Sequence, residues 1–153
     1  MDNAIISYLG ENKPNLITSI TSLLTDLGGE FSGVTFATLG RGCELTMVYN
    51  KPDDIDIDKI KKQLEKLETC KDGEFTVKLF KLSTEAGPTT KITHRIILSG
   101  EDQPGLLHKI INTLDENSAV IVRMNTEKIT FPDNTQYISR FAIAVRDDNA
   151  PQC

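Results

Sequence analysis

The spacing of hydrophobic and polar residues changes along the chain and predicts an ordered series of strands and helices. The short apolar run 4–9 predicts a buried strand. Between residues 14 and 27 apolar side chains recur every three or four residues, which is typical of one face of a helix. Residues 31–39 and 45–49 are rich in β-branched and aromatic side chains and are separated by a Gly-Arg-Gly turn, so they predict a β-hairpin.

The same reading continues through the rest of the first half. Residues 56–68 combine apolar side chains at helical spacing with lysines and glutamates on the other positions, and either Asp56 or Asp54 is a suitable cap. Residues 75–82 alternate between apolar and polar, as in a half-buried strand. The order βαββαβ predicts an α+β, ferredoxin-like fold, with an antiparallel four-stranded sheet and both helices on one face.

The second half repeats only part of this order. After a linker at 83–91, residues 92–98 predict a strand, a helix follows from Pro104, and residues 119–131 and 137–145 predict further strands. In the last strand Phe141 and Ile143 share one face. The second half is therefore βαββ and lacks the last helix and strand. We expect one complete domain at 1–82 and an incomplete one at 92–153.

This incomplete order would leave the 92–98 strand at the edge of its sheet. Either the chain is truncated or the uncovered surface serves a partner, and the sequence leaves both alternatives open. We expect the surface to be covered by another chain or by the first domain.

One motif occurs twice, at an offset of 90 residues. Gly10–Ile20 and Gly100–Ile110 share five of eleven residues: Gly, Glu, Pro, Leu and Ile. Each copy follows a predicted strand and opens a predicted helix, with proline at the first helical position. Asn12 and Asp102 are placed to accept hydrogen bonds from the free amides of the first turn. Those amides and the helix dipole together favour an anionic group such as a carboxylate.

Composition narrows the classes of function. The formal charge is −5, from 17 basic and 22 acidic residues, which disfavours a nucleic-acid partner because phosphates require a basic surface. No apolar run approaches the roughly 20 residues that span a bilayer, and the N-terminus is not basic, so we expect a cytoplasmic protein without a membrane partner. Cys43, Cys70 and Cys153 are widely spaced and predict reduced thiols rather than a disulfide framework or a metal site.

Catalytic groups are difficult to find. His94 and His108 are the only histidines, and no nucleophile, paired-carboxylate or phosphate-loop motif accompanies them. We therefore expect no enzyme activity, no cofactor and no metal.

The repeated strand-loop-helix motif within βαββαβ resembles the ACT domain, a small regulatory module that senses amino acids. Two copies without an attached enzyme are similar to the tandem ACT proteins of the glycine cleavage system transcriptional repressor family. The resemblance implies a regulatory protein that binds a glycine- or serine-like amino acid, forms a homo-oligomer such as a dimer, and acts on a transcription regulator protein. It also implies ligand-binding residues in both loops: Glu11, Asn12, Lys13, Pro14, Asn15, Leu16, Glu101, Asp102, Gln103, Pro104, Gly105 and Leu106.

By the same resemblance, Asn12 and Asp102 contact the ligand, and Gly105 lets the ligand or a partner backbone approach closely. The first copy departs from the pattern with Asn15, which adds bulk. Asp102→Ala is therefore expected to weaken amino-acid binding more than Asn12→Ala. A ligand-free dimerisation or docking module is the alternative function, since a proline-opened helix is also an ordinary structural feature.

Overall fold

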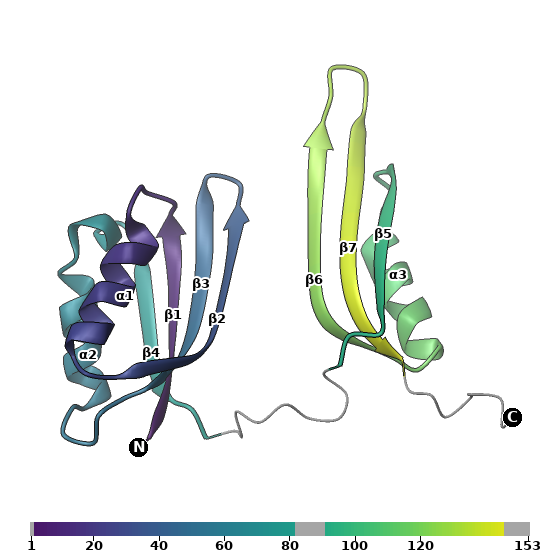
Figure 1. Cartoon of the computed structure of the whole chain (residues 1–153). Helices are drawn as coiled ribbons and strands as arrows, with labels where there is room; N and C mark the ends of the chain where they lie inside the picture. Colours follow the sequence, from purple (N-terminus) through teal and green to yellow (C-terminus); the bar gives the residue numbers. More distant parts are fainter. Residues whose placement is uncertain (1, 82–90, 146–153) are drawn as a thin grey trace, which may run out of the picture. The chain divides into compact units, whose positions relative to one another are not determined.

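The computed structural model describes residues 2–81 and 91–145. The chain divides into two compact units, residues 1–84 and 85–153, and each is described by itself (Figure 1). Residues 83–90 of the expected linker, and the irregular segment expected at 146–153 with Cys153, lie outside the described residues.

The first unit has the predicted βαββαβ order. Its elements are β1 Asn3–Glu11, α1 Leu16–Asp26, β2 Glu30–Leu39, β3 Gly42–Asn50, α2 Ile57–Glu65, the 3-10 helix η1 Glu68–Cys70, and β4 Glu74–Leu79. The strands are antiparallel in the order β2-β3-β1-β4. Both helices cover the same face of this sheet (Figure 1), so the ferredoxin-like prediction is confirmed.

The core of the first unit lies between the sheet and its two helices. Alternate residues of β1 and β3 are buried, as expected for strands with one covered face. At the centre the Tyr49 hydroxyl donates a hydrogen bond of 2.7 Å to the Leu24 carbonyl and so ties the end of α1 to β3. The largest fully buried side chains are Tyr8, Tyr49, Ile6, Leu16, Ile20, Leu24, Leu45, Met47, Ile60, Leu64, Cys43 and Cys70.

The start of α2 is as predicted, but its end is not. Of the two predicted caps, the structure uses Asp56, whose carboxylate accepts a hydrogen bond of 2.7 Å from the Lys59 amide. The predicted end of this helix at residue 68 is wrong. The α-helix ends at Glu65, and the following turn tightens into η1, whose Cys70 side chain enters the core.

The second unit is βαββ across residues 91–145. Its elements are β5 His94–Glu101, α3 Leu106–Glu116, β6 Ala119–Thr130 and β7 Thr135–Val145. The strand order is β5-β7-β6, so β5 lies at an edge of the sheet as predicted. Phe141 and Ile143 of β7 pack together with the apolar residues of α3, so the face that they share is the inner face of this strand.

Equivalent helices are buried to different extents in the two units. Leu16, Ile20 and Leu24 of α1 are at most 2% exposed, whereas α3 contains no fully buried residue. The residues 90 positions later, at 106, 110 and 114, are only partly buried. In the first unit α2 packs on β4 beside α1, and the described part of the second unit has no equivalent layer. The described part of the second unit therefore has a thinner core than the first unit.

Candidate functional site

The candidate site in each unit is the loop between the first strand and the first helix. In both units the strand runs further than predicted and includes Glu11 or Glu101, so these two acids are strand residues. The helices begin at Leu16 and Leu106. The prolines therefore occupy the preceding turn, and the prediction that they are the first helical residues is wrong.

The residue before each helix has a left-handed backbone. Asn15 has φ 63° and ψ 12°, and Gly105 has φ 75° and ψ 7°. This conformation favours glycine and tolerates asparagine better than most residues, which explains the two residue types at this position. The carbonyl oxygens of Asn15 and Gly105 accept the first helical hydrogen bonds, from Ser19 at 2.9 Å and from Lys109 at 3.0 Å.

The predicted side-chain caps are absent from both helices. Neither α1 nor α3 has a side-chain hydrogen bond at its N-cap. The left-handed residue puts the cap position at Asn15 and Gly105, three residues after Asn12 and Asp102. In the described part of the chain, no acceptor contacts the amides of Leu107 and His108 in the first turn of α3.

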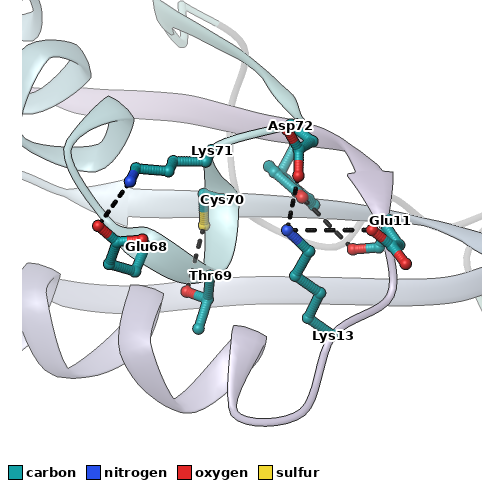
Figure 2. Close-up of polar contacts among 8 residues, drawn as sticks. Glu11, Lys13, Glu68, Thr69, Cys70, Lys71 and Asp72 are labelled. Atoms are coloured by element: carbon teal, nitrogen blue, oxygen red, sulfur yellow. Dashed lines mark hydrogen bonds and ion pairs between the residues drawn. The ribbon is translucent and has the colours of Figure 1, made fainter.

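The first loop is anchored by Lys13, as Figure 2 shows. Its ammonium Nζ lies 2.8 Å from Asp72 Oδ2, in the turn before β4, and 3.9 Å from Glu11 Oε2. The hydrogen bond from Lys13 lowers the pKa of the Asp72 carboxyl, and the same bond raises the pKa of Lys13. The backbone N–H of Asn12 also donates a hydrogen bond of 3.3 Å to the backbone carbonyl of Arg41. The first loop is thus tied to two neighbouring turns.

The second loop is anchored by a different residue. Asp102 Oδ2 lies 2.9 Å from the Nζ atom of Lys128, a β6 residue. The Lys128 ammonium also lies 5.9 Å from the centre of the Tyr137 ring, and the hydrogen bond to Asp102 raises its pKa. The Asp102 amide donates a hydrogen bond of 3.4 Å to the Thr135 carbonyl. A carboxylate and an ammonium therefore lie together at the open start of α3.

The predicted site residues fall into two separate sets. In the first loop Glu11, Asn12, Pro14 and Asn15 are exposed and Lys13 is partly buried. Residues 101–105 of the second loop are exposed, and Leu106 is partly buried. Leu16 is only 2% exposed and belongs to the core.

Sequence reasoning missed the two residues that anchor these loops. Asp72 lies 59 residues after Lys13, and Lys128 lies 26 residues after Asp102. The only signal for Lys128 is its place opposite Tyr137 in the β6-β7 register. That register follows from the strand turn and not from any local motif.

The remaining candidate chemical groups lie away from the loops. His94 and His108 are exposed. Cys43 and Cys70 are buried free thiols, and burial raises the pKa of both, which disfavours the nucleophilic thiolate. Within the described residues no three His, Cys, Asp or Glu side chains are arranged to hold a metal ion.

A hollow of about 320 Å³ lies beside α2 and β4, and none of the predicted site residues lines it. Its lining residues are Lys61, Glu65, Cys70, Lys71, Gly73, Glu74 and Phe75. No helix in the described part of the chain is long and apolar enough to cross a bilayer.

Each unit has the ferredoxin-like order of elements, complete in the first and partial in the second, and solved structures share this order. A structure described as "an Unknown Protein from Galdieria sulphuraria" matches at a TM-score of 0.72 and 16% identity, and the match covers 95% of this chain and 83% of the other. A protein described as a "putative glycine cleavage system transcriptional repressor" matches at a TM-score of 0.68 and 16% identity, covering 95% of this chain and 81% of its own.

A third structure, an ACT domain protein from Streptococcus pneumoniae, covers 51% of this chain and 89% of its own at a TM-score of 0.46 and 14% identity. No family model and no curated protein matches the sequence. The fold expected from the ACT resemblance is confirmed across both units by the two structures that each cover 95% of this chain.

Proposed function

We propose that this protein is a non-enzymatic regulator that binds a small, glycine- or serine-like amino acid at its second loop. The observation that carries the proposal is the ion pair between Asp102 and Lys128, 2.9 Å apart at the start of α3. A free amino acid carries an ammonium and a carboxylate, so a site with one charge of each sign matches both ends of the ligand.

The surroundings of this ion pair suit a small ligand. The free amides of Leu107 and His108 add donors for the ligand carboxylate, next to the positive end of the helix dipole. Gly105 has no side chain to obstruct a close approach. The side chains of Lys128 and Asp102 are 59% and 35% exposed, and ion pairs this open to water contribute little to stability. A ligand can therefore separate them at small cost.

The first loop is the weaker candidate. Asn12 is neutral. The ammonium-bearing side chain of Lys13 is only 28% exposed in its ion pair with Asp72, against 59% for Lys128, so a ligand carboxylate reaches it less easily. Asn15 adds a side chain where the second loop has Gly105. These differences support the expectation that Asp102 contributes more to ligand binding than Asn12.

Regulation would follow from linkage. A ligand that binds one assembly state more tightly than another shifts the population toward that state, by as much as the two affinities differ. A structure of like fold is described as a "putative glycine cleavage system transcriptional repressor", and this likeness supports a role in transcriptional regulation. The partner that we propose for this role is a transcription regulator protein.

The test is a thermal-shift screen of the full chain against the twenty amino acids. Ligand at about 100 times its Kd should add roughly 2.7 kcal/mol and raise Tm by a few degrees. Glycine methyl ester and acetate, which each lack one of the two charges, should give no shift. If no amino acid raises Tm, the sensing function is wrong.

Two pairs of variants then locate the site. Asp102→Asn and Lys128→Met should each remove most of the shift, because each leaves one end of the ligand without its partner. Asn12→Ala and Lys13→Met are the matched controls in the first loop and should retain it. Equal losses of the thermal shift from the variants of both loops would contradict the assignment of the ligand site to the second loop.

A ligand-free dimerisation or docking module is the second candidate function. The observation that favours it is the position of β5 at the sheet edge. It predicts an oligomer that depends on protein concentration and is indifferent to every amino acid.

A further inference from the structure

Among the described residues, one edge of β5 has no neighbouring strand, which distinguishes the second unit from the first. In the first unit the equivalent strand, β1, lies between β3 and β4, whereas β5 pairs only with β7 among the described strands. Ile97 and Leu98, at the middle of β5, are 70% and 39% exposed. An exposed apolar edge of this kind is a template for pairing with another strand.

The backbone groups on this edge can be assigned. The Asp102 amide bonds to Thr135, so the even-numbered residues of β5 point their N–H and C=O groups toward β7. The odd-numbered residues Arg95, Ile97, Ser99 and Glu101 therefore point theirs outward. The first unit agrees, because the amide of Phe80, just after β4, bonds to the carbonyl of Asn3, an odd-numbered residue of β1. In the described part of the second unit, no strand contacts these outward groups.

We infer that this edge pairs with the β5 edge of a second copy of the chain, in antiparallel orientation about a two-fold axis at Leu98. The edge is complementary to itself in charge. Arg95 lies near one end and Glu101 near the other, both exposed and on the same face of the strand. Two-fold pairing centred on Leu98 places Arg95 of each copy opposite Glu101 of the other.

This register also suits the backbone and the apolar residues. It makes Arg95 and Glu101 one hydrogen-bonded pair and Ile97 and Ser99 another, using only the outward groups. The two Leu98 side chains meet across the axis on the face that carries α3. A shift of the axis to Ile97 would place Arg95 opposite Ser99 and leave both charges unpaired. Charge therefore selects one register, and the inference does not depend on amino-acid binding.

The experiment is sedimentation velocity of the full chain over a range of concentrations. The wild-type chain should dimerise, and Arg95→Glu or Glu101→Arg should each weaken dimerisation by about tenfold, because each reversal puts two like-charged pairs across the axis. Arg123→Glu is the matched control, since it makes the same change in charge on β6, at the other edge of the sheet. It should leave the dissociation constant unchanged.

Mixing the two charge-reversal variants is the decisive measurement. One chain then carries acidic side chains at both positions 95 and 101, and the other carries basic side chains at both. Every cross-axis pair is therefore of opposite charge, so the mixture should form heterodimers with wild-type affinity. The double variant R95E/E101R should also regain the dimer. Hydrogen exchange should show the β5 amides protected only at concentrations where the dimer forms.

Three results would overturn the inference. The first is a chain that stays monomeric at every concentration while its own residues protect the β5 amides from exchange. The second is a dimer that neither charge reversal weakens. The third is a pair of charge-reversal variants that do not form heterodimers when mixed. A dimer whose dissociation constant is unchanged by both charge reversals would show that the interface lies on another surface.

Discussion

Gly10 and Gly100 occupy the same position in the two copies of the motif, but only Gly10 lies in crowded surroundings. A Cβ atom added at Gly10 would lie 2.7 Å from the Cα atom of Gly73 and would also clash with the Tyr8 hydroxyl. At Gly100 nothing lies within 4 Å of the added atom. Neither glycine has a positive φ, so alanine causes no backbone strain at either position, and the two substitutions differ only in the packing around the added methyl group.

The two glycine-to-alanine changes should alter the free energy of unfolding in opposite directions. At Gly10 the obstacle is the backbone of Gly73, which cannot rotate away, and overpacking of this kind costs about 1–3 kcal/mol. Reduced entropy of the unfolded chain returns about 0.4–1 kcal/mol. The two terms together span a net cost of about 0 to 2.6 kcal/mol. Because the obstacle is rigid backbone, Gly10→Ala should destabilise the first unit by an amount in the upper part of that range, about 1–2.6 kcal/mol. Gly100→Ala should stabilise the second unit by up to about 1 kcal/mol, because only the entropy effect remains.

The measurement is urea unfolding followed by hydrogen exchange and mass spectrometry, with peptides from β1 and β5 reporting the two units separately. Far-UV circular dichroism on the same samples gives the overall transition. A Gly10→Ala chain within about 0.5 kcal/mol of wild type would show that the turn at Gly73 yields easily, and the reasoning would be refuted. Destabilisation by Gly100→Ala would show that another group covers the α3-side face of β5 at this position.

Three further predictions follow from burial and charge. Ile20→Ala should lower the free energy of unfolding of the first unit by about 2–5 kcal/mol, because Ile20 is fully buried. Ile110→Ala should lower that of the second unit clearly less, because Ile110 is only partly buried. The same exchange assay compares the two variants, and equal losses would mean that α3 is covered. The bond from Lys13 lowers the pKa of Asp72, so its stabilising effect should be complete above the ordinary carboxyl pKa of 3.8 and lost as the pH falls through the lower folded value. Urea midpoints of wild type and Asp72→Asn should therefore differ at pH 7 and converge in acid, and a constant difference would argue against the pair. Because burial raises the pKa of the Cys43 and Cys70 thiols, both should react slowly with a thiol reagent at about pH 8 until the chain is unfolded in urea, and mass spectrometry of labelled peptides would reveal any rapid native reaction.

The order of elements can be predicted from the sequence because the two hydrophobic periods are clear. Alternation in β7 correctly places Phe141 and Ile143 on one face, and the spacing in α1 identifies its buried stripe. The ends of the elements are harder to predict. Strands β1 and β5 continue through glycine and glutamate because their neighbours β3 and β7 extend that far, which is a tertiary effect that local sequence does not encode.

The predicted start of each helix is wrong for a local reason. Proline is common at the first helical position, and Asn12 and Asp102 are common capping residues. The structure instead uses a left-handed residue, Asn15 or Gly105, as the cap. The family resemblance implies that the glycine permits close approach of a ligand, but its backbone conformation alone already favours that residue type.

The two loops differ because each is anchored to a different part of its unit. In the first, the charged residue is Lys13, and its partner Asp72 belongs to the connection between α2 and β4. The described part of the second unit lacks that connection. Its loop has the neutral Gln103 in place of the lysine, and the charge is instead the acid Asp102, which pairs with Lys128 of β6. The charged residue of each loop therefore has the sign opposite to that of its partner, Asp72 in the first unit and Lys128 in the second. Exchanging residues 12–13 with 102–103 should therefore break both ion pairs. The loops are consequently not interchangeable, although they share a motif. A ligand of the kind proposed would have to compete at the second loop with an ion pair to β6, and at the first loop with an ion pair to the turn before β4.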